Sequence, residues 1–475
     1  MRKIVLLVTI VLFSLSCFAE QTKREMTIFE FLKVVEAKYD KIENSVQKIK
    51  LENEIYLNDN TVGVSSGVGY DSYDNNSNEK ISYGWNTTLT GNSSFGTRLQ
   101  VNTSGRTTEY EDNSYYTDSY GSSFSVEFSQ SIIQGIVDRF NKVEKAKIQY
   151  DEDITNYERE KSYVITTAAR EFIYYNQLER VKNIYKNDIE ELNNKLQEVS
   201  SMIDSAEKKL AISSIYYKIN SLKDSIEIID NNILNKKYVL YALVGANINK
   251  ENISFVDFID IIEIDNSKTY INNLGKNFTT KLKYNSIDLL NNSIQSSIND
   301  GLPDLKFQTG FEFDNAYKSS SEIYKYGKPN YGIGLSLTYT IFSTNNEKIE
   351  LKKLNLKTEE ENLDDLITFD ENNRQKYNES LEMKVKNNAD VLTKKSIYTE
   401  NEELRFGLIK KLLAKPNSEL DLLDDQIEKF MYEFDMKSDY SFKYLDNKVS
   451  MISSLLSMLN AYGKTSEYIL NSNNE

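Results

Sequence analysis

Histidine is absent from this chain of 475 residues, and cysteine occurs only once. Without an imidazole, the chain cannot build a Ser-His-Asp or Cys-His triad, a His-ligated metal site or an HExxH zinc site. The sequence also has no phosphate-binding loop, no nucleotide fingerprint and no basic patch, and its formal net charge of −15 disfavours nucleic acid as a partner. We therefore expect no enzyme, no catalytic residue, no metal and no cofactor.

Proline is also scarce. The chain has three prolines, and the first of them is Pro303. Because proline breaks a helix interior, a stretch of this length without proline favours very long helices. A chain of 475 residues is also long enough to bury a large core.

The N-terminal segment has the pattern of a secretory signal peptide. Arg2 and Lys3 precede an apolar run from Ile4 to Leu15, and small residues lead to a cleavage site after Ala19. Residues 1–19 are therefore predicted to be removed on export. The alternative is a lipoprotein in which Cys17 becomes the lipidated first residue. No later apolar run approaches 18 residues, so no transmembrane helix is predicted.

Four segments before residue 130 alternate apolar and polar residues with a period of two, which predicts β-strands. Each is about ten residues long, and polar stretches rich in Asn, Asp, Ser and Gly separate them. Length and alternation both fit tilted strands of an outer-membrane barrel. The apolar positions that define the four runs begin at Val62, Ile81, Phe95 and Tyr120.

Helical periodicity surrounds these strands. Apolar residues spaced by three and four predict an amphipathic helix over about residues 27–56. A longer stripe over about 132–244 fits coiled-coil packing, and small polar residues at 198–206 predict that it folds back as a helical hairpin. Residues 20–250 thus form a first structural repeat, with β-strands at about 61–130.

The second half of the chain repeats this plan after a connecting segment at 251–276. Residues 277–475 contain a helix, β-strands at about 304–342 and a helical hairpin at about 345–470. Pro303 and Pro329 stand at strand entries and Pro416 at the hairpin tip, where proline disturbs structure least. The recurrence indicates an internal duplication.

The order of parts resembles the TolC-like outer-membrane efflux protein family, the outer membrane factors. The segments Leu302-Pro303-Asp304-Leu305 and Leu337-Thr338-Tyr339-Thr340-Ile341-Phe342 resemble its strand entry and exit, and Ser418-Glu419-Leu420-Asp421-Leu422-Leu423-Asp424-Asp425-Gln426 resembles the residues after its hairpin tip. The resemblance implies an α+β membrane protein in the outer membrane. Three protomers would share one β-barrel, which a coiled-coil α-helical barrel continues across the periplasm.

The resemblance also implies the function and the partners. It predicts a homotrimeric channel that conducts substrates passively to the exterior, docked on a periplasmic adaptor protein and an inner-membrane pump or ABC exporter. Whether the system is an efflux pump or a type I secretion system stays open. The alternative from another class is a non-conducting surface adhesin or structural spacer made of coiled coil.

The number of barrel strands stays open at this stage. Two or three strand pairs cannot close a barrel, and unpaired edges cannot face lipid, so oligomerisation is required. Family members usually contribute four strands per protomer, whereas this chain offers six candidates. A trimer would have about 12 strands if residues 81–108 form a surface hairpin, and about 18 if they join the barrel.

Two aspartates are the main candidate site residues. Asp421 and Asp424 lie three residues apart, on one helical face beside the second hairpin tip. They correspond to the aspartates that surround the periplasmic aperture in the family, where a ring of carboxylates would favour cations. Their alternative role is that of a solvated helix face. At the first tip Asp204 is the analogous residue. Lys415 could replace the arginine that latches the family's closed aperture as a cation, but not as a planar bidentate donor.

Overall fold

A computed structural model describes residues 24–43, 45–58, 60–75, 78–93, 96–110, 119–202, 206–245, 253–260, 267–317, 330–338, 345–414 and 420–471. The predicted signal peptide and Cys17 lie outside these residues. The chain divides into two compact units. We call Ser45–Asn156 with Thr280–Leu366 the sheet unit, and Met1–Asn44, Tyr157–Thr279 and Ile367–Glu475 the helical unit.

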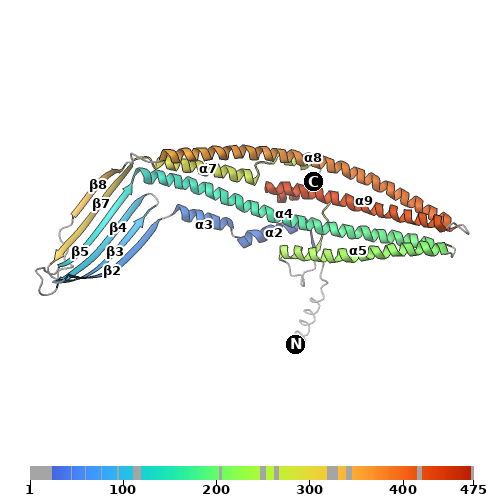
Figure 1. Ribbon diagram of the computed structural model, residues 1–475, viewed down its shortest axis with the longest axis horizontal. Helices are drawn as coiled ribbons and strands as arrows, with labels where there is room; N and C mark the ends of the chain where they lie inside the picture. Colours follow the sequence, from blue (N-terminus) through green and yellow to red (C-terminus); the bar gives the residue numbers. More distant parts are fainter. Residues whose placement is uncertain are drawn as a thin grey trace, which may run out of the picture. The chain divides into compact units, whose positions relative to one another are not determined.

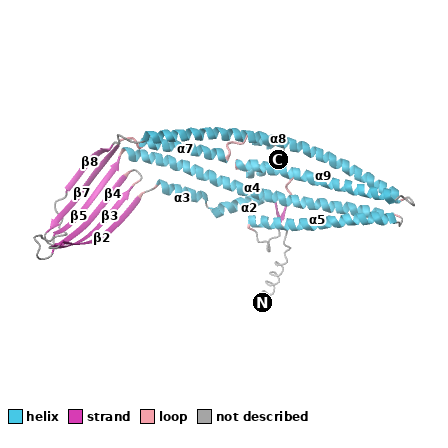
Figure 2. Ribbon diagram, viewed as in Figure 1, coloured by secondary structure: helices cyan, strands magenta, loops and turns pink. Residues whose placement is uncertain are grey.

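The sheet unit is built around six strands, which Figures 1 and 2 show as one sheet. Their order is β2-β3-β4-β5-β7-β8, and every neighbouring pair is antiparallel. The bounds are Thr61–Asn75 for β2, Asn78–Asn92 for β3, Thr97–Tyr110 for β4, Ser119–Ser131 for β5, Asp304–Tyr317 for β7 and Asn330–Thr338 for β8. Residues 81–92 belong to β3 and residues 97–108 to β4, so both parts of the segment 81–108 are central strands of the sheet.

The register separates apolar from polar residues across the whole sheet. One row of paired residues crosses all six strands and is apolar throughout: Val64, Leu89, Val101, Val126, Phe311 and Tyr331. The adjacent row belongs to the other face and contains only small or polar residues: Gly63, Thr90, Gln100, Glu127, Gly310 and Gly332. Because side chains alternate along a strand, the two rows define two chemically distinct faces.

Helices of the sheet unit include α3 (Ser45–Leu57) and α7 (Phe278–Asn299), with the first parts of α4 (Ile133–Ser200) and α8 (Asn345–Leu413). Hydrogen bonds connect them where polar side chains reach neighbouring backbones. Lys352 Nζ donates to the carbonyl oxygen of Ser293 at 3.0 Å, and Asn292 Nδ2 donates to that of Asn141 at 3.2 Å. These contacts join α8 to α7 and α7 to α4.

The helical unit contains the remaining parts of α4 and α8, together with α2 (Ile28–Glu43), α5 (Ala206–Val244), α6 (Ser267–Asn272), α9 (Leu420–Ala461) and α10 (Thr465–Asn471). Two short parallel strands, β1 (Arg24–Met26) and β6 (Ile253–Phe255), pair within it. Its larger core gathers buried side chains from these helices and strands and from the segment after β6, including Phe31, Phe172 and Phe258. A capping box begins α2, because Thr27 and Glu30 each accept the other's backbone N–H.

The pattern at 27–56 predicts a helix, and α2 and α3 occupy this region, with residue 44 outside the described part. The predicted final helix is interrupted, because Gly463 adopts φ 69° between α9 and α10. Glycine tolerates this left-handed backbone after a helix, which amphipathic periodicity does not report. Among the helices that the structure describes, none is long and apolar enough to cross a membrane.

Candidate functional site

The apolar face of the sheet is uncovered in the isolated chain. Val68 on β2 is 90% exposed and Ile333 on β8 is 80% exposed, and large apolar side chains on β3 and β4 are also exposed. Soluble monomers rarely expose a contiguous apolar surface of this extent. The strands β2 and β8 are also the two edges of the sheet. On the outer side of each edge strand, the backbone N–H and C=O groups have no neighbouring strand in this sheet to pair with.

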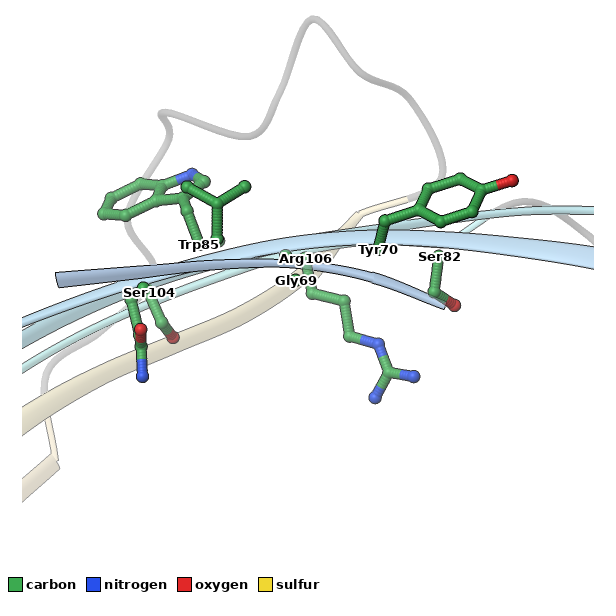
Figure 3. Close-up of a pocket in the computed structure, with 11 residues that line it drawn as sticks. Gly69, Tyr70, Ser82, Trp85, Ser104 and Arg106 are labelled. Atoms are coloured by element: carbon green, nitrogen blue, oxygen red, sulfur yellow. The ribbon is translucent and has the colours of Figure 1, made fainter. Parts of the chain in front are cut away.

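The opposite face carries small and hydrogen-bonding side chains. The hydroxyl oxygens of Ser104 and Ser123 lie 2.6 Å apart, and Asn102 Nδ2 donates to Ser125 Oγ at 3.1 Å. Figure 3 shows the division: Tyr70 and Trp85 lie on one side of the strands, and Ser82, Ser104 and Arg106 on the other. The register assigns the charged residues Asp71, Lys80, Arg98, Arg106, Glu127, Asp304, Lys306, Glu312 and Asp314 to this face.

A glycine allows the only tryptophan to lie flat on the sheet. Trp85 pairs with Gly105 on the neighbouring strand, and a Cβ atom added at Gly105 would lie 2.5 Å from the indole Nε1. Any larger residue at 105 would therefore displace the indole from the apolar face. The pattern fits strands whose aromatic residues lie at a membrane interface.

The ends of the two helical hairpins pack together in the helical unit. Leu192 and Val199 of α4, Ile215 of α5, and Leu423 and Phe434 of α9 are buried in one hydrophobic cluster, with residues of α8. An ion pair also crosses between the hairpins, because Lys410 Nζ lies 2.8 Å from Glu198 Oε2. The helix ends are therefore held by apolar packing and by charge.

Asp421 and Asp424 lie in the first two turns of α9, and both are exposed. Leu423 between them is fully buried, so it anchors the turn from which the two carboxylates project into solvent. In the part of the chain that the structure describes, neither aspartate forms an ion pair. Asp204 and Lys415 lie outside the described residues. The ring of aspartates stays a prediction, because it requires other copies of the chain.

Comparison with known proteins finds similarity in structure but no match in sequence. No protein-family model matches the sequence, and no curated protein matches it. Three solved structures match with a TM-score of 0.56: the Campylobacter jejuni CmeC outer membrane channel, the Neisseria gonorrhoeae MtrE outer membrane channel in its open state, and the Vibrio cholerae outer membrane protein VceC. The chain has a TolC-like outer-membrane-factor fold.

The match extends over almost the whole chain, although the sequences have diverged far. The alignments cover 92% of this chain and 86% of CmeC, 92% and 89% for MtrE, and 90% and 95% for VceC. The identities are 13%, 11% and 8% in the same order. The expected combination of helical hairpins and a sheet is therefore confirmed at the level of the fold.

Within this TolC-like fold, a buried charge network lies among the helices near the hairpin ends. Glu402 of α8 is 0% exposed, and its carboxylate accepts hydrogen bonds from Lys195 of α4 and from Lys437 of α9, the latter at 2.8 Å. Glu191 accepts from both lysines at 2.6 Å. Lys195 Nζ also lies within 6 Å of three phenylalanine ring centroids.

Burial and charge oppose each other in this network. Burial lowers the pKa of Lys195, and the neighbouring Glu191 carboxylate offsets only part of that effect. Burial acts on Glu191 in the direction that raises its pKa, but hydrogen bonds from Lys195 and Lys437 bring the pKa below its usual value. Nearby, burial raises the pKa of Asp188, although the Ser438 hydroxyl donates to its carboxylate at 2.6 Å.

Sequence reasoning missed this network, although a signal for it exists. Lys195 lies three residues after Leu192 and four before Val199, both of which are fully buried. Lys437 follows the buried Phe434 by three residues, and Glu402 precedes the buried Phe406 by four. Charged residues at core spacing on three helices predict a buried ion network when they are considered together.

Proposed function

We propose that this protein is the outer-membrane exit channel of a tripartite efflux pump or type I secretion system. One observation carries the proposal: the sheet has a continuous apolar face on one side and a small, polar face on the other. A lipid bilayer satisfies the first face and a water-filled lumen satisfies the second. CmeC and MtrE, which share the fold, are outer membrane channels.

The arrangement of the strands supports a closed trimeric barrel. Six is an even number and all neighbours are antiparallel, so β8 of one copy can pair with β2 of the next without breaking the alternation. Three copies would close a barrel of 18 strands. Because β3 and β4 lie between β2 and β5 in the sheet, the alternative of about 12 strands would require both to leave it.

The remaining assignments follow from this arrangement. The barrel lies in the outer membrane, and the helices continue the channel into the periplasm. There they meet a periplasmic adaptor and an inner-membrane pump or ABC exporter, which supplies the energy. The boundaries of the two structural repeats at 20–250 and 277–475, with the connecting segment between them, remain part of the proposal.

Asp421 and Asp424 are proposed to surround the periplasmic aperture, with Asp204 at the other hairpin tip. Three copies would place six carboxylates from α9 around one opening. Their combined field would raise the local concentration of cations and repel anions. Both carboxylates are exposed on the first turns of their helix, as such a ring requires.

Planar-bilayer recording of the purified, detergent-extracted protein tests the channel and the aperture separately. In detergent the parent protein should migrate as a trimer, and in the bilayer it should conduct ions. Replacing both aspartates (Asp421→Asn with Asp424→Asn) should weaken block by multivalent cations. A matched double variant, Asp364→Asn with Asp365→Asn, removes the same number of exposed charges from the first third of α8 and should behave like the parent.

Two results would contradict these assignments in different ways. A monomer that never conducts would overturn the channel and leave the adhesin or spacer as the better interpretation. Normal conductance with unchanged cation block in the Asp421/Asp424 variant would overturn the aperture assignment only.

A further inference from the structure

Arg106 lies in a row of paired residues that are otherwise glycine or alanine. On β4 it pairs with Gly84 of β3 on one side and with Gly121 of β5 on the other. The row continues to Gly69 on β2 and to Ala316 on β7. Across five neighbouring strands, Arg106 is therefore the only residue of this row with a side chain larger than a methyl group.

The neighbours of Arg106 along the strands are small and already hydrogen-bonded to each other. The hydroxyl oxygens of Ser104 and Ser123 lie 2.6 Å apart, and those of Thr108 and Ser82 lie 3.2 Å apart. Arg106 itself is exposed and, in the part of the chain that the structure describes, forms no ion pair. Figure 3 shows its guanidinium group extending away from the sheet on the side opposite Trp85.

The other arginine of this face lies in a different environment. Arg98 Nη2 donates to Gln100 Oε1 at 2.7 Å, so that guanidinium already has a partner. Glu127 lies in the same region of the face, where the register pairs it with Gln100 on β4 and with Gly310 on β7. The charges around Arg98 are therefore mixed, whereas Arg106 has no ion-pair partner among the described side chains, although the register also assigns Asp71 and Asp314 to its face.

Open space surrounds Arg106 as well. A Cβ atom added at Gly69 would meet nothing within 4 Å, and one added at Gly84 would meet only the Gly105 carbonyl oxygen at 3.6 Å. Packing therefore does not require glycine at these two positions. Glycine there leaves the planar guanidinium accessible, with its fork of N–H donors unoccupied for a carboxylate or a phosphate.

We propose that Arg106 is an anion-recognising residue in the lumen of the barrel and selects solutes that carry carboxylate or phosphate groups. The proposal rests on the channel function above, because three copies around one lumen give the ring of three guanidinium groups. Lipid phosphate is not the ligand in this proposal, because lipid would contact the apolar face of the sheet and Arg106 lies on the polar face. Arg106 would thus favour anions at its own level of the barrel, while the proposed aperture favours cations.

Reversal potentials in a KCl gradient test the proposal. At about 0.01 M salt the Debye length is about 30 Å, so the field of the ring reaches across the lumen. Arg106→Glu should move the reversal potential toward the potassium equilibrium value, and Arg106→Gln should move it by about half as much. Arg106→Lys keeps the charge and should match the parent. A change of about one kT in the lumen potential alters the chloride-to-potassium ratio several-fold.

A second pair of variants tests whether the absence of a partner matters. Gly84→Glu places a carboxylate beside Arg106 in open space and should reproduce the shift of Arg106→Gln. Gly84→Gln adds the same bulk without charge and should leave the reversal potential unchanged. Equal shifts in both variants would assign the effect to bulk and overturn the proposal.

Inorganic pyrophosphate, added from the barrel side, tests recognition of the anion itself. It should block the parent and Arg106→Lys transiently and lose that effect in Arg106→Glu. If all Arg106 variants conduct with the same reversal potential and the same pyrophosphate block as the parent, Arg106 has no role in selection. The proposed channel function would then be unaffected. If the parent does not conduct, the channel function fails first.

Discussion

At the residue scale, the same type of side chain titrates in opposite directions in two places of the helical unit. Asp260 accepts hydrogen bonds from Arg180 and Lys448, and the Arg180 guanidinium is the main cause that lowers its pKa to about 2. Asp188 is buried, and burial raises its pKa. A charged partner stabilises the ionised form, whereas loss of water destabilises it.

These directions predict opposite effects of two isosteric changes. The contribution of Asp260 is present above its unfolded pKa of about 3.9 and is lost as the pH falls toward 2. Asp260→Asn should therefore lower the thermal midpoint at pH 7, and the difference should vanish below about pH 2. Asp260 is 62% exposed, so the effect should be small.

Asp188→Asn is the matched comparison. A raised pKa means that the folded state binds the proton more tightly, so the charged form is unfavourable at neutral pH. The variant should be as stable as the parent at pH 7 or more stable, and this gain should disappear in acid. Circular dichroism melts between pH 2 and pH 7 measure both variants. A destabilised Asp188→Asn at pH 7 would contradict the direction given for Asp188.

At the element scale, the buried network joins three helices through four side chains. Lys195 of α4, Glu402 of α8 and Lys437 of α9 have almost no contact with water, and Glu191 completes their hydrogen bonds. An ion that loses its partner in such a place stays buried and uncompensated. The network therefore makes the relative positions of these helices sensitive to any single change.

Glu402→Ala should destabilise the helical unit by about 3–5 kcal/mol, because both lysines then lose their buried partner. Replacing the three buried members with apolar residues (Glu402→Leu, Lys195→Met, Lys437→Met) leaves only the more exposed Glu191 and should restore most of the thermal midpoint. Glu198→Ala removes an exposed partner of Lys410 and should change stability by less than about 1 kcal/mol. A triple variant as unstable as Glu402→Ala would show that the charges themselves stabilise the bundle.

Much of this architecture could be predicted from the sequence because it depends on local periodicity. Alternation located strands at both places where the sheet has them, and small residues near Ser200 located the turn between α4 and α5. The interruption at Gly463 could not be predicted in this way, since one residue in a left-handed conformation leaves the apolar period almost unchanged.

The pairing of distant elements was harder to predict. The position of β3 and β4 in the sheet depends on register with β2 and β5, which the composition of a single strand does not encode. The same limit applies to Glu402, because its partners lie on two other helices. In the candidate site, the structure shows that Asp421 and Asp424 are exposed. Their role in an aperture remains a prediction.

At the scale of the whole molecule, β3 and β4 determine how wide a trimeric barrel would be. Barrel diameter grows roughly in proportion to the number of strands, so 18 strands enclose an aqueous lumen of the width found in porins. Removing both strands leaves β2 and β5, which can still pair antiparallel through the loop between them. The shortened chain retains an even number of strands per copy.

Deleting residues 78–110 should therefore give a trimer with a barrel of about two thirds the diameter. Polymer exclusion from the barrel side measures this width without depending on the aperture. The parent should admit polyethylene glycols that the shortened protein excludes. Equal exclusion limits in two well-folded trimers would show that β3 and β4 do not line the lumen.

The pairing of β5 with β7 has a consequence for how the chain folds. These neighbours in the sheet are separated in the sequence by α4, α5, β6, α6 and α7, so β7 is synthesised long after β5. Until then the four-stranded meander β2 to β5 presents an uncovered apolar face and two open edges, which favour aggregation. Non-local pairing of this kind is slow. A nascent protomer therefore needs protection from aggregation, and the time before β7 pairs with β5 sets how long that protection must last.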